Sequence, residues 1–378
     1  MKIGILSMQR VINNGSLLQA YGLKRTIELL GNELQFVDYK ISDNDSENTS
    51  FGNHLRKSHF YVHMLLSIIK NLFKGGLNDV KLAISNNLNY RKFTNEYLNV
   101  LNLSPKPNYS ANVDVLVFGS DEVFNTTQYV EVGIGHAWQL YGADNQAKKL
   151  VSYAASFGHT TYEKLEKYNM VDKASFYLRR FASFSVRDKN SFDIIKSLTG
   201  IEANINIDPV LLYDFSDIDI KKPKLENYIL VYAYPGRINC SEEIESVRAF
   251  AKKHNKKLVC VNMMQTWCDE MIYAHPFDLL GYFKYADYVV TDTFHGAVIS
   301  IKYNVPFIQF IRDSSTYSNN QKVGYLLQSF GLEDRILKNL DEFEKCLCEH
   351  IDYTKVNKKI DIERERSMNY LRQALKLD

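Results

Sequence analysis

The segment Thr291-Asp292-Thr293-Phe294-His295-Gly296 has the residue types and the setting of a catalytic turn. A β-branched run, Tyr288–Thr291, precedes it and a helical pattern, Gly296–Tyr303, follows it, so we expect His295 just before a helix. Free backbone N–H groups at a helix start attract phosphate, and an imidazole that titrates near neutral pH can move protons. The alternative is that His295 only caps the helix. We predict that His295 is catalytic and that three neighbours bind substrate: Thr293, Phe294 and Gly296.

A second candidate is Arg187, which follows the predicted strand Ser183–Val186. A cation at the end of a buried strand needs an anionic partner, and a guanidinium group can hold phosphate or carboxylate with two parallel hydrogen bonds. The alternative is an internal ion pair with Asp188 or another carboxylate. We predict that Arg187 belongs to the catalytic site, where it binds an anion.

Three more turns combine glycine with hydroxyl, carboxamide or carboxylate side chains after predicted strands. They are Asn13-Asn14-Gly15-Ser16, Gly119-Ser120-Asp121-Glu122 and the end of the segment Tyr153-Ala154-Ala155-Ser156-Phe157-Gly158-His159. Glycine allows a ligand to approach the backbone, and the polar groups can hold hydroxyls or anions. Each turn also has a plainer interpretation, as a loop or a helix cap, and His159 as a solvated histidine. The predicted substrate-binding residues are Asn13, Asn14, Gly15, Ser120, Asp121 and Ser156.

Short β-branched runs alternate with helical patterns on both sides of a charged stretch, Tyr213–Asn227, that contains Pro223. Such alternation predicts parallel sheets with helices on both faces. In the first half the predicted strands are Lys2–Met8, Leu34–Tyr39, Val113–Phe118, Leu150–Ala155, Ser183–Val186 and Ile205–Leu212, and the helices are Leu17–Leu30, Tyr162–Phe181 and Lys189–Leu198. In the second half the strands are Tyr228–Ala233, Lys257–Val261, Tyr288–Thr291 and Phe307–Ile311, and the helices are Ser241–His254, Phe277–Tyr285 and Gly296–Tyr303.

We therefore predict an α/β protein with a GT-B-like fold, in which two doubly wound, Rossmann-like domains face a cleft. The N-terminal domain would span 1–215, with a helical insertion at about 53–100. The C-terminal domain would span 225–350, and residues 355–378 would form a C-terminal helix. Ligands of such sheets bind beyond the carboxyl ends of the strands, where every turn named above falls.

Bulk composition narrows the classes of function. The 378 residues include 46 basic and 44 acidic ones, and the net charge of +2 gives no reason to expect a nucleic-acid partner. We find neither a signal peptide nor an apolar stretch that could span a membrane, so we expect a cytoplasmic protein. The five cysteines are odd in number and lack the spacing of a disulfide framework or a zinc site. We expect no metal and no cofactor.

Several segments together resemble the polysaccharide pyruvyl transferase family. They run in order from residue 1 to about 310 and include NNGSLLQAYGLKRTI, DVLVFGSDEVFN, SYAASFG, FSVRD, NIDPVLLY and ADYVVTDTFHGAVISIKYNVPFI. Each segment is weak alone. Their order and spacing are specific, above all around Phe294-His295-Gly296.

The resemblance implies a GT-B-like fold and the transfer of pyruvate from phosphoenolpyruvate to two sugar hydroxyls as a cyclic ketal, in the synthesis of a capsule or another exopolysaccharide. It implies that His295 is the acid/base residue and that Arg187 clamps an anion. The donor would bind the C-terminal domain. A saccharide or lipid-linked saccharide acceptor would bind the N-terminal domain, which would bring the protein close to a membrane surface. Some members carry arginine where this chain has Thr293, so a phosphate contact is missing here or comes from elsewhere, for example from Arg312.

Two other functions stay open. A GT-B glycosyltransferase with a nucleotide-sugar donor would use the same fold and the same histidine, but it needs base-stacking and ribose contacts that we do not identify in the sequence. A carbohydrate-binding protein that has lost catalysis is the other alternative, and the presence of His295 and Arg187 argues against it.

Overall fold

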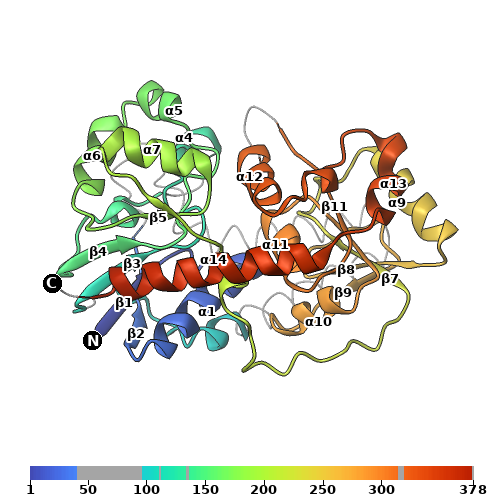
Figure 1. Ribbon diagram of the computed structural model, residues 1–378, viewed down its shortest axis with the longest axis horizontal. Coiled ribbons are helices and arrows are strands. Elements are labelled where there is room, and N and C mark those ends of the chain that lie inside the picture. Colours follow the sequence, from blue (N-terminus) through green and yellow to red (C-terminus); the bar gives the residue numbers. More distant parts are fainter. Residues whose placement is uncertain (41–95, 110–111, 133–135, 314–318, 377–378) are drawn as a thin grey trace, which may run out of the picture.

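The computed structural model describes residues 1–40, 96–109, 112–132, 136–313 and 319–376, and it contains two separate parallel sheets (Figure 1). The first sheet has the strand order β2-β1-β3-β4, and a short pair, β5 and β6, continues it beside β4 through the isolated bridges Val151–Ser183 and Ala155–Val186. Its strands are β1 (Lys2–Leu6), β2 (Glu33–Phe36), β3 (Val115–Phe118), β4 (Lys149–Ser152), β5 (Ser185–Val186) and β6 (Asn204–Ile205).

The second sheet has the order β11-β10-β7-β8-β9, and all its strand pairs are parallel. Each sheet reverses its strand order once, between β1 and β3 and between β7 and β10. Ligand sites of doubly wound sheets lie at such reversal points. The strands are β7 (Tyr228–Tyr232), β8 (Lys257–Val261), β9 (Glu270–Ile272), β10 (Tyr288–Thr291) and β11 (Phe307–Gln309).

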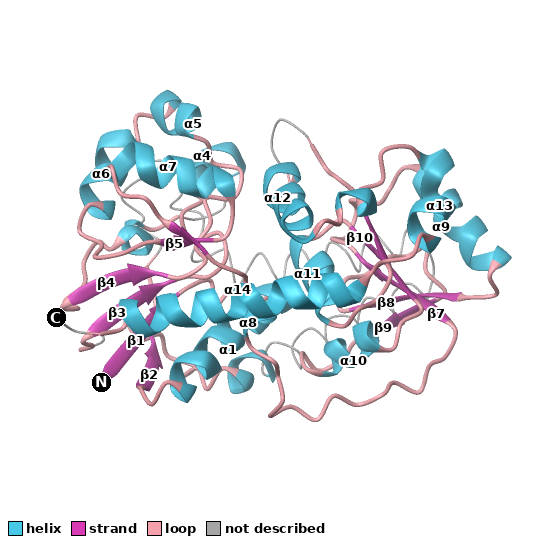
Figure 2. Cartoon of the chain, in the orientation of Figure 1, coloured by secondary structure: helices cyan, strands magenta, loops and turns pink. Residues whose placement is uncertain are grey.

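Helices cover both sheets (Figure 2). Those of the first half are α1 (Asn14–Leu29), α4 (Thr127–Val132), α5 (Tyr162–Lys167), α6 (Val171–Leu178), α7 (Lys189–Thr199) and α8 (Pro209–Leu212), with a 3₁₀ turn, η2, at Trp138–Tyr141. Those that follow are α9 (Ser241–Lys253), α10 (Asp278–Lys284), α11 (Phe294–Lys302), α12 (Asn320–Phe330), α13 (Phe343–Cys348) and α14 (Tyr353–Ala374), with 3₁₀ turns η3 (Glu333–Arg335) and η4 (Leu340–Glu342).

The core explains why the two halves hold together. Successive side chains of a strand point to opposite faces of its sheet, so Ile3 and Ile5 of β1 join one hydrophobic cluster and Leu6 joins another. The cluster of Ile3 and Ile5 also takes in Leu230 of β7 and Ile299 of α11, in the second half. One buried core thus connects the two sheets.

The C-terminal helix α14 runs along both halves (Figure 2). Near its start, the hydroxyl of Tyr353 donates to the carbonyl of Val305, in the second half, at 2.6 Å. Near its end, the hydroxyl of Tyr370 donates to the carbonyl of Ser152, in the first half, at 2.8 Å. The tail helix predicted at the C-terminus is therefore present and bridges the two sheets.

Two predicted elements are wrong. The helix expected over Tyr162–Phe181 is two helices, because Asn169 adopts a left-handed backbone conformation with φ of 54° between α5 and α6. The strand expected over Ile205–Leu212 stops at once. Asp208 caps a new helix, α8, whose first residue is Pro209, and proline is favoured at that position.

Most of the predicted helical insertion at about 53–100 falls outside the described residues. Its last residues, 96–100, are described and helical. The domain bounds also stay a prediction. The strands of the first sheet and its extension end at Ile205, and those of the second sheet begin at Tyr228.

Candidate active site between the two sheets

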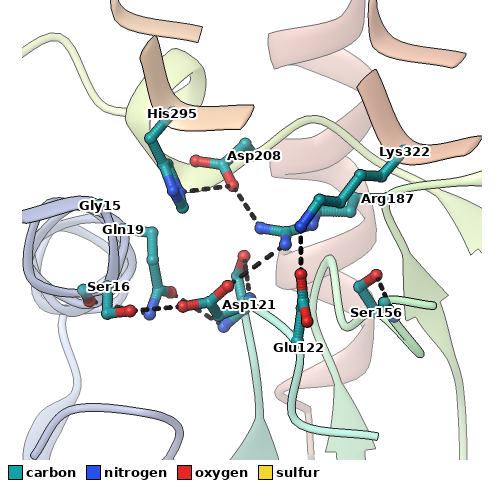
Figure 3. Close-up of polar contacts among 12 residues, drawn as sticks. Gly15, Ser16, Gln19, Asp121, Glu122, Ser156, Arg187, Asp208, His295 and Lys322 are labelled. Carbon is teal, nitrogen blue, oxygen red and sulfur yellow. Dashed lines mark hydrogen bonds and ion pairs between the residues drawn. The ribbon is translucent and has the colours of Figure 1, made fainter. Parts of the chain in front are cut away.

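Charged side chains meet where the carboxyl ends of the two sheets face each other (Figure 3). They surround a cavity of about 50 Å³. Pockets that hold small ligands are commonly about 300–1,000 Å³, so a sugar needs this cavity to widen. The cavity is lined by Asn13, Ser16, Asp121, Glu122, Arg187, Tyr232, Tyr234, Met263, Thr293, Phe294, His295 and Lys322.

His295 lies in the first turn of α11, and not before the helix as predicted. The cap is Thr293, whose hydroxyl accepts a hydrogen bond from the backbone N–H of Gly296 at 2.9 Å. The imidazole is buried against α1, where a Cβ added to Gly15 would lie 2.2 Å from its Nδ1. Its Nε2 lies 3.5 Å from Oδ2 of Asp208 and has no hydrogen-bond partner among the described residues. The capping role therefore belongs to Thr293, and one ring nitrogen of His295 is left beside a carboxylate.

Arg187 lies between two carboxylates of the first half. Its Nη1 donates to Oδ2 of Asp208 at 3.0 Å, and its Nη2 donates to Oδ1 of Asp121 at 3.2 Å. The guanidinium carbon also lies 4.3 Å from the ring centre of Phe294, from the second half. An internal ion pair is thus present, with these two partners and not with Asp188, which caps α7. Three of the five N–H bonds of Arg187 are left for other acceptors.

The carboxyls beside Arg187 are kept ionised. Burial alone raises the pKa of Asp121, but the charge of Arg187, followed by that of His295, outweighs burial and holds the pKa below its usual range. Burial likewise raises the pKa of Asp208, and His295 and Arg187 again bring it below its usual range. Both groups can therefore accept hydrogen bonds at neutral pH.

The start of α1 joins this network. The side chain of Asn13 caps the helix by accepting from the backbone N–H groups of Gly15 at 2.8 Å and Ser16 at 3.3 Å. Its amide group donates to the hydroxyl of Tyr234, in the second half, at 2.8 Å. The hydroxyl of Ser16 donates to Oδ2 of Asp121 at 2.6 Å. The turn predicted at 13–16 is therefore the cap and first turn of the helix.

A second ion pair crosses the cavity, between Lys322 of α12 and Glu122 of the first half. The other oxygen of Glu122 accepts from the amide of Asn125 at 2.7 Å, and this amide lies 3.3 Å from Nδ1 of His159. Burial raises the pKa of Glu122, but the charge and hydrogen bond of Lys322 together with the charge of Arg187 bring it below its usual range. Asn125 and His159 support Glu122 and do not line the cavity.

Most predicted site residues come together. Gly15 and Gly296 do not line the cavity. A Cβ on Gly296 would lie 2.0 Å from the hydroxyl of Thr291. Asn14 lines a neighbouring cavity of about 170 Å³, which shares Asn13, Tyr234 and Met263 with the first. The predicted residues that line the first cavity are Asn13, Asp121, Arg187, Thr293, Phe294 and His295.

Ser120 and Ser156 do not line either cavity. The hydroxyl of Ser120 accepts from the backbone N–H of Asp121 at 2.6 Å. The hydroxyl of Ser156 donates to Oδ2 of Asp188 at 2.6 Å. Both are buried, and in this structure they shape loops.

Sequence reasoning did not single out several residues of the site. Asp208 could have been found, because an Asp-Pro pair is typical of a cap followed by the first helical residue. Lys322 has no such signal, since it lies in a helix that the sequence analysis did not assign. The site residues that were not among the predicted ones are Ser16, Glu122, Asp208, Tyr232, Tyr234, Met263 and Lys322.

Two charged residues of the second half, Asp292 and Arg312, do not line the cavity. Arg312, the suggested substitute for a missing phosphate contact, donates to both carboxylate oxygens of Glu243 at 2.6 and 2.9 Å. Burial raises the pKa of Asp292 to about 6, and the charges of Arg237 and Arg312 only partly offset it. One carboxylate oxygen of Asp292 has no hydrogen-bond partner among the described residues.

A family model described as polysaccharide pyruvyl transferase matches residues 13–314, which include the whole site except Lys322. The chain belongs to the polysaccharide pyruvyl transferase family. Members of this family are transferases, and the resemblance stated from the motifs is confirmed. No curated protein matches the chain significantly.

Solved structures show the fold of this pyruvyl transferase family member. The Staphylococcus aureus MnaA co-structure with UDP has a TM-score of 0.52 and 10% identity, with 99% of this chain and 96% of that chain covered. A putative UDP-N-acetylglucosamine 2-epimerase from Listeria monocytogenes has a TM-score of 0.52 and 10% identity, with 99% and 95% covered. These likenesses, with the two parallel sheets, confirm the predicted GT-B-like α/β fold.

In the part of the chain that the structure describes, no group of three or more His, Cys, Asp or Glu side chains could hold a metal ion. No helix among the same residues is long and apolar enough to cross a membrane.

Proposed function

We propose that this protein transfers pyruvate from phosphoenolpyruvate to two hydroxyls of one saccharide, forming a cyclic ketal and releasing phosphate. The observation that carries the proposal is the placement of His295, with its unpartnered Nε2 beside Asp208 in the cavity between the two sheets. Family membership supports the reaction class.

The second half supplies groups for the donor. The N-terminus of α11 carries partial positive charge and His295 lies in its first turn, so the phosphate and carboxylate of phosphoenolpyruvate have attractive surroundings there. Arg187 stays a predicted anion clamp from the opposite wall, through the N–H bonds that Asp121 and Asp208 leave over.

The first half supplies acceptors for sugar hydroxyls. Asp121 and Asp208 are ionised, and Asn13 and Ser16 add a carboxamide and a hydroxyl. A saccharide diol presents O–H donors that suit carboxylates. We therefore place the acceptor, free or lipid-linked, on this wall, and the lipid-linked form would hold the protein at a membrane surface.

The reaction needs three proton transfers, one to the methylene carbon of the donor and one from each sugar hydroxyl. In the first step the protonated imidazole of His295 gives its proton to the methylene carbon of the donor, and the first sugar hydroxyl attacks the central carbon. The neutral imidazole then takes the hydroxyl proton, and Asp208 stabilises the imidazolium that results. In the second step the bond from the central carbon to the phosphate oxygen breaks. The second hydroxyl closes the ring, and its proton leaves with the phosphate.

The proposal includes a cytoplasmic location, since phosphoenolpyruvate is made there, and a role in the synthesis of a capsule or another exopolysaccharide. The test is to incubate the protein with phosphoenolpyruvate and a panel of lipid-linked and nitrophenyl saccharides, and to measure phosphate release together with the mass of the product. Nucleotide sugars serve as the competing donors in the same assay. Turnover of a nucleotide sugar without turnover of phosphoenolpyruvate would make the protein a glycosyltransferase, and turnover of neither would favour a carbohydrate-binding role.

A further inference from the structure

Lys322 is a buried cation in the wall of the cavity, and only 9% of its side chain is exposed. It comes from the first turn of α12, on the same half as His295 (Figure 3). The family model ends at residue 314, so the family match assigns this lysine no role. Burying an ammonium group is costly unless an anion lies beside it, and here the anion is Glu122.

The second half has few other cations to offer an anionic donor. Thr293 is neutral, and Arg312 is held by both carboxylate oxygens of Glu243. Among the described residues that line the cavity, Lys322 is the one lysine or arginine of the second half. Lys322 is therefore the permanent positive charge that the second half can offer to a donor beside His295, opposite Arg187 of the first half.

We propose that Lys322 binds the phosphate group of the donor, and that Glu122 holds the ammonium group in its place until the donor arrives. This inference rests on the proposed function. Glu122 is itself kept in position by the amide of Asn125 at 2.7 Å, so the pair forms an oriented charge.

The plainer interpretation is that Lys322 and Glu122 form only an ion pair that joins the two halves. The two interpretations differ in the effect of Glu122→Gln. If the pair is only structural, removing either charge destabilises the protein and leaves phosphate affinity unchanged. If Glu122 competes with phosphate for the ammonium group, Glu122→Gln tightens phosphate binding and Lys322→Ala weakens it.

The experiment is isothermal titration of the full-length protein with inorganic phosphate, phosphoenolpyruvate and UDP. We compare wild type with Lys322→Ala, Lys322→Arg and Glu122→Gln, and check folding by circular dichroism. Lys253→Ala is the matched control, because Lys253 forms an exposed ion pair with Glu344 on the same half, at 2.8 Å and outside the cavity. We expect Lys322→Ala to weaken phosphate and phosphoenolpyruvate binding about 10- to 100-fold, as the loss of one charge-assisted hydrogen bond would. Lys322→Arg should restore part of it, Glu122→Gln should tighten it, and Lys253→Ala should have no effect.

Wild-type phosphate affinity in a folded Lys322→Ala protein would overturn the inference, and so would unchanged phosphate affinity in a folded Glu122→Gln protein. So would a wild type that binds none of the three probes. Failure of the proposed function can be distinguished from failure of the role of Lys322. If phosphate or UDP binding depends on Lys322 but phosphoenolpyruvate is never consumed, the lysine keeps its role and the donor is another phosphate ester. If phosphoenolpyruvate is consumed with the same KM by wild type and Lys322→Ala, the function stands and the role of Lys322 falls.

Discussion

The two sheet edges that face each other across the cavity differ in charge. The edge of the first sheet presents Asp121, Glu122 and Asp208, each with a pKa held below its usual range by a cation despite burial. The edge of the second sheet presents His295, Lys322 and the N-terminus of α11. Both edges lie at the point where their sheet reverses its strand order, so the fold alone does not separate their roles. Their charges differ: carboxylates, interrupted by Arg187, suit hydroxyl donors at the first edge, and the second edge suits anions.

Removing the imidazole from the second edge should have the largest effect. We expect His295→Ala to lower turnover about 10²- to 10⁴-fold, because a positioned acid/base group contributes about that much. The melting temperature should change little, since Thr293 and not His295 caps the helix. Steady-state kinetics and thermal unfolding measure the two effects.

The matched control is His254→Ala, because His254 lies at the end of α9, where it contacts Glu344, and does not line the cavity. It should keep wild-type turnover. A His295→Ala protein with near wild-type turnover on a confirmed acceptor would show that the second edge binds but does not catalyse.

The contact between the two edges can be tested at Gly15. A methyl group there would lie 2.2 Å from Nδ1 of His295, so Gly15→Ala must push the imidazole away from its position. A displacement of about 1 Å can cost about 10²-fold in rate, and we expect a loss of that order in kcat. Gly324→Ala is the control, because its added Cβ would lie 3.6 Å from the nearest atom, Oδ1 of Asn320, in ordinary contact within a helix. It should keep activity and add up to about 1 kcal/mol of stability. Equal kcat in both variants would contradict the placement of His295.

The second edge also contains a carboxyl whose pKa is shifted in the opposite direction. Burial raises the pKa of Asp292 from 3.8 to about 6. The protonated carboxyl of Asp292 is favoured by the folded state, and this contribution to the free energy of unfolding is fully present below pH 3.8. It is lost as the pH rises through about 6, because the folded state must then hold a buried charge. Asp292→Asn should therefore gain stability over wild type between about pH 4 and 7, by at most roughly 3 kcal/mol. Denaturant unfolding across this range measures the difference.

Asp208→Asn provides the opposite case, because the pKa of Asp208 is lowered in the folded state. Its stabilising charge is present above the usual carboxyl pKa and is lost as the pH falls, so this variant should be less stable than wild type at neutral pH. The same sign of change in both variants would contradict the division between the two edges.

The smallest effect concerns the cap of α11. Thr293→Ala removes the acceptor for the backbone N–H of Gly296 and should cost about 1 kcal/mol of stability, while Thr293→Ser should keep most of it. Chemical denaturation of the two variants measures the difference. Equal stability would mean that another group satisfies this N–H, and His295 would then be the first residue to examine.

The sequence was a good guide to the strands and to the turns that follow them. Strands Lys257–Val261 and Tyr288–Thr291 match their predicted bounds, since apolar β-branched runs between turns identify buried parallel strands. Helix starts were placed too late at α1 and α11, because the pattern of apolar residues does not include the polar cap and first turn.

The site was predicted in part for a related reason. His295, Arg187 and Asp121 each follow a predicted strand closely. The sequence therefore places each of them at the carboxyl edge of its sheet. Lys322 reaches the cavity from a helix on the other half, and only the packing of the two halves brings it opposite Glu122. Ser156 follows a strand as well, but its hydroxyl turns to Asp188, a choice that local sequence does not determine.

The most direct test of the account is the fate of the central carbon of phosphoenolpyruvate. The protein is incubated with donor labelled with carbon-13 at that position and with a saccharide acceptor, and the product is examined by NMR while phosphate is measured. We predict that the label appears in a ketal carbon bonded to two oxygens of one sugar, with one phosphate released per product, and that His295→Ala abolishes both signals. Phosphate release without a labelled ketal, or transfer of sugar from a nucleotide donor with the labelled phosphoenolpyruvate left intact, would contradict it.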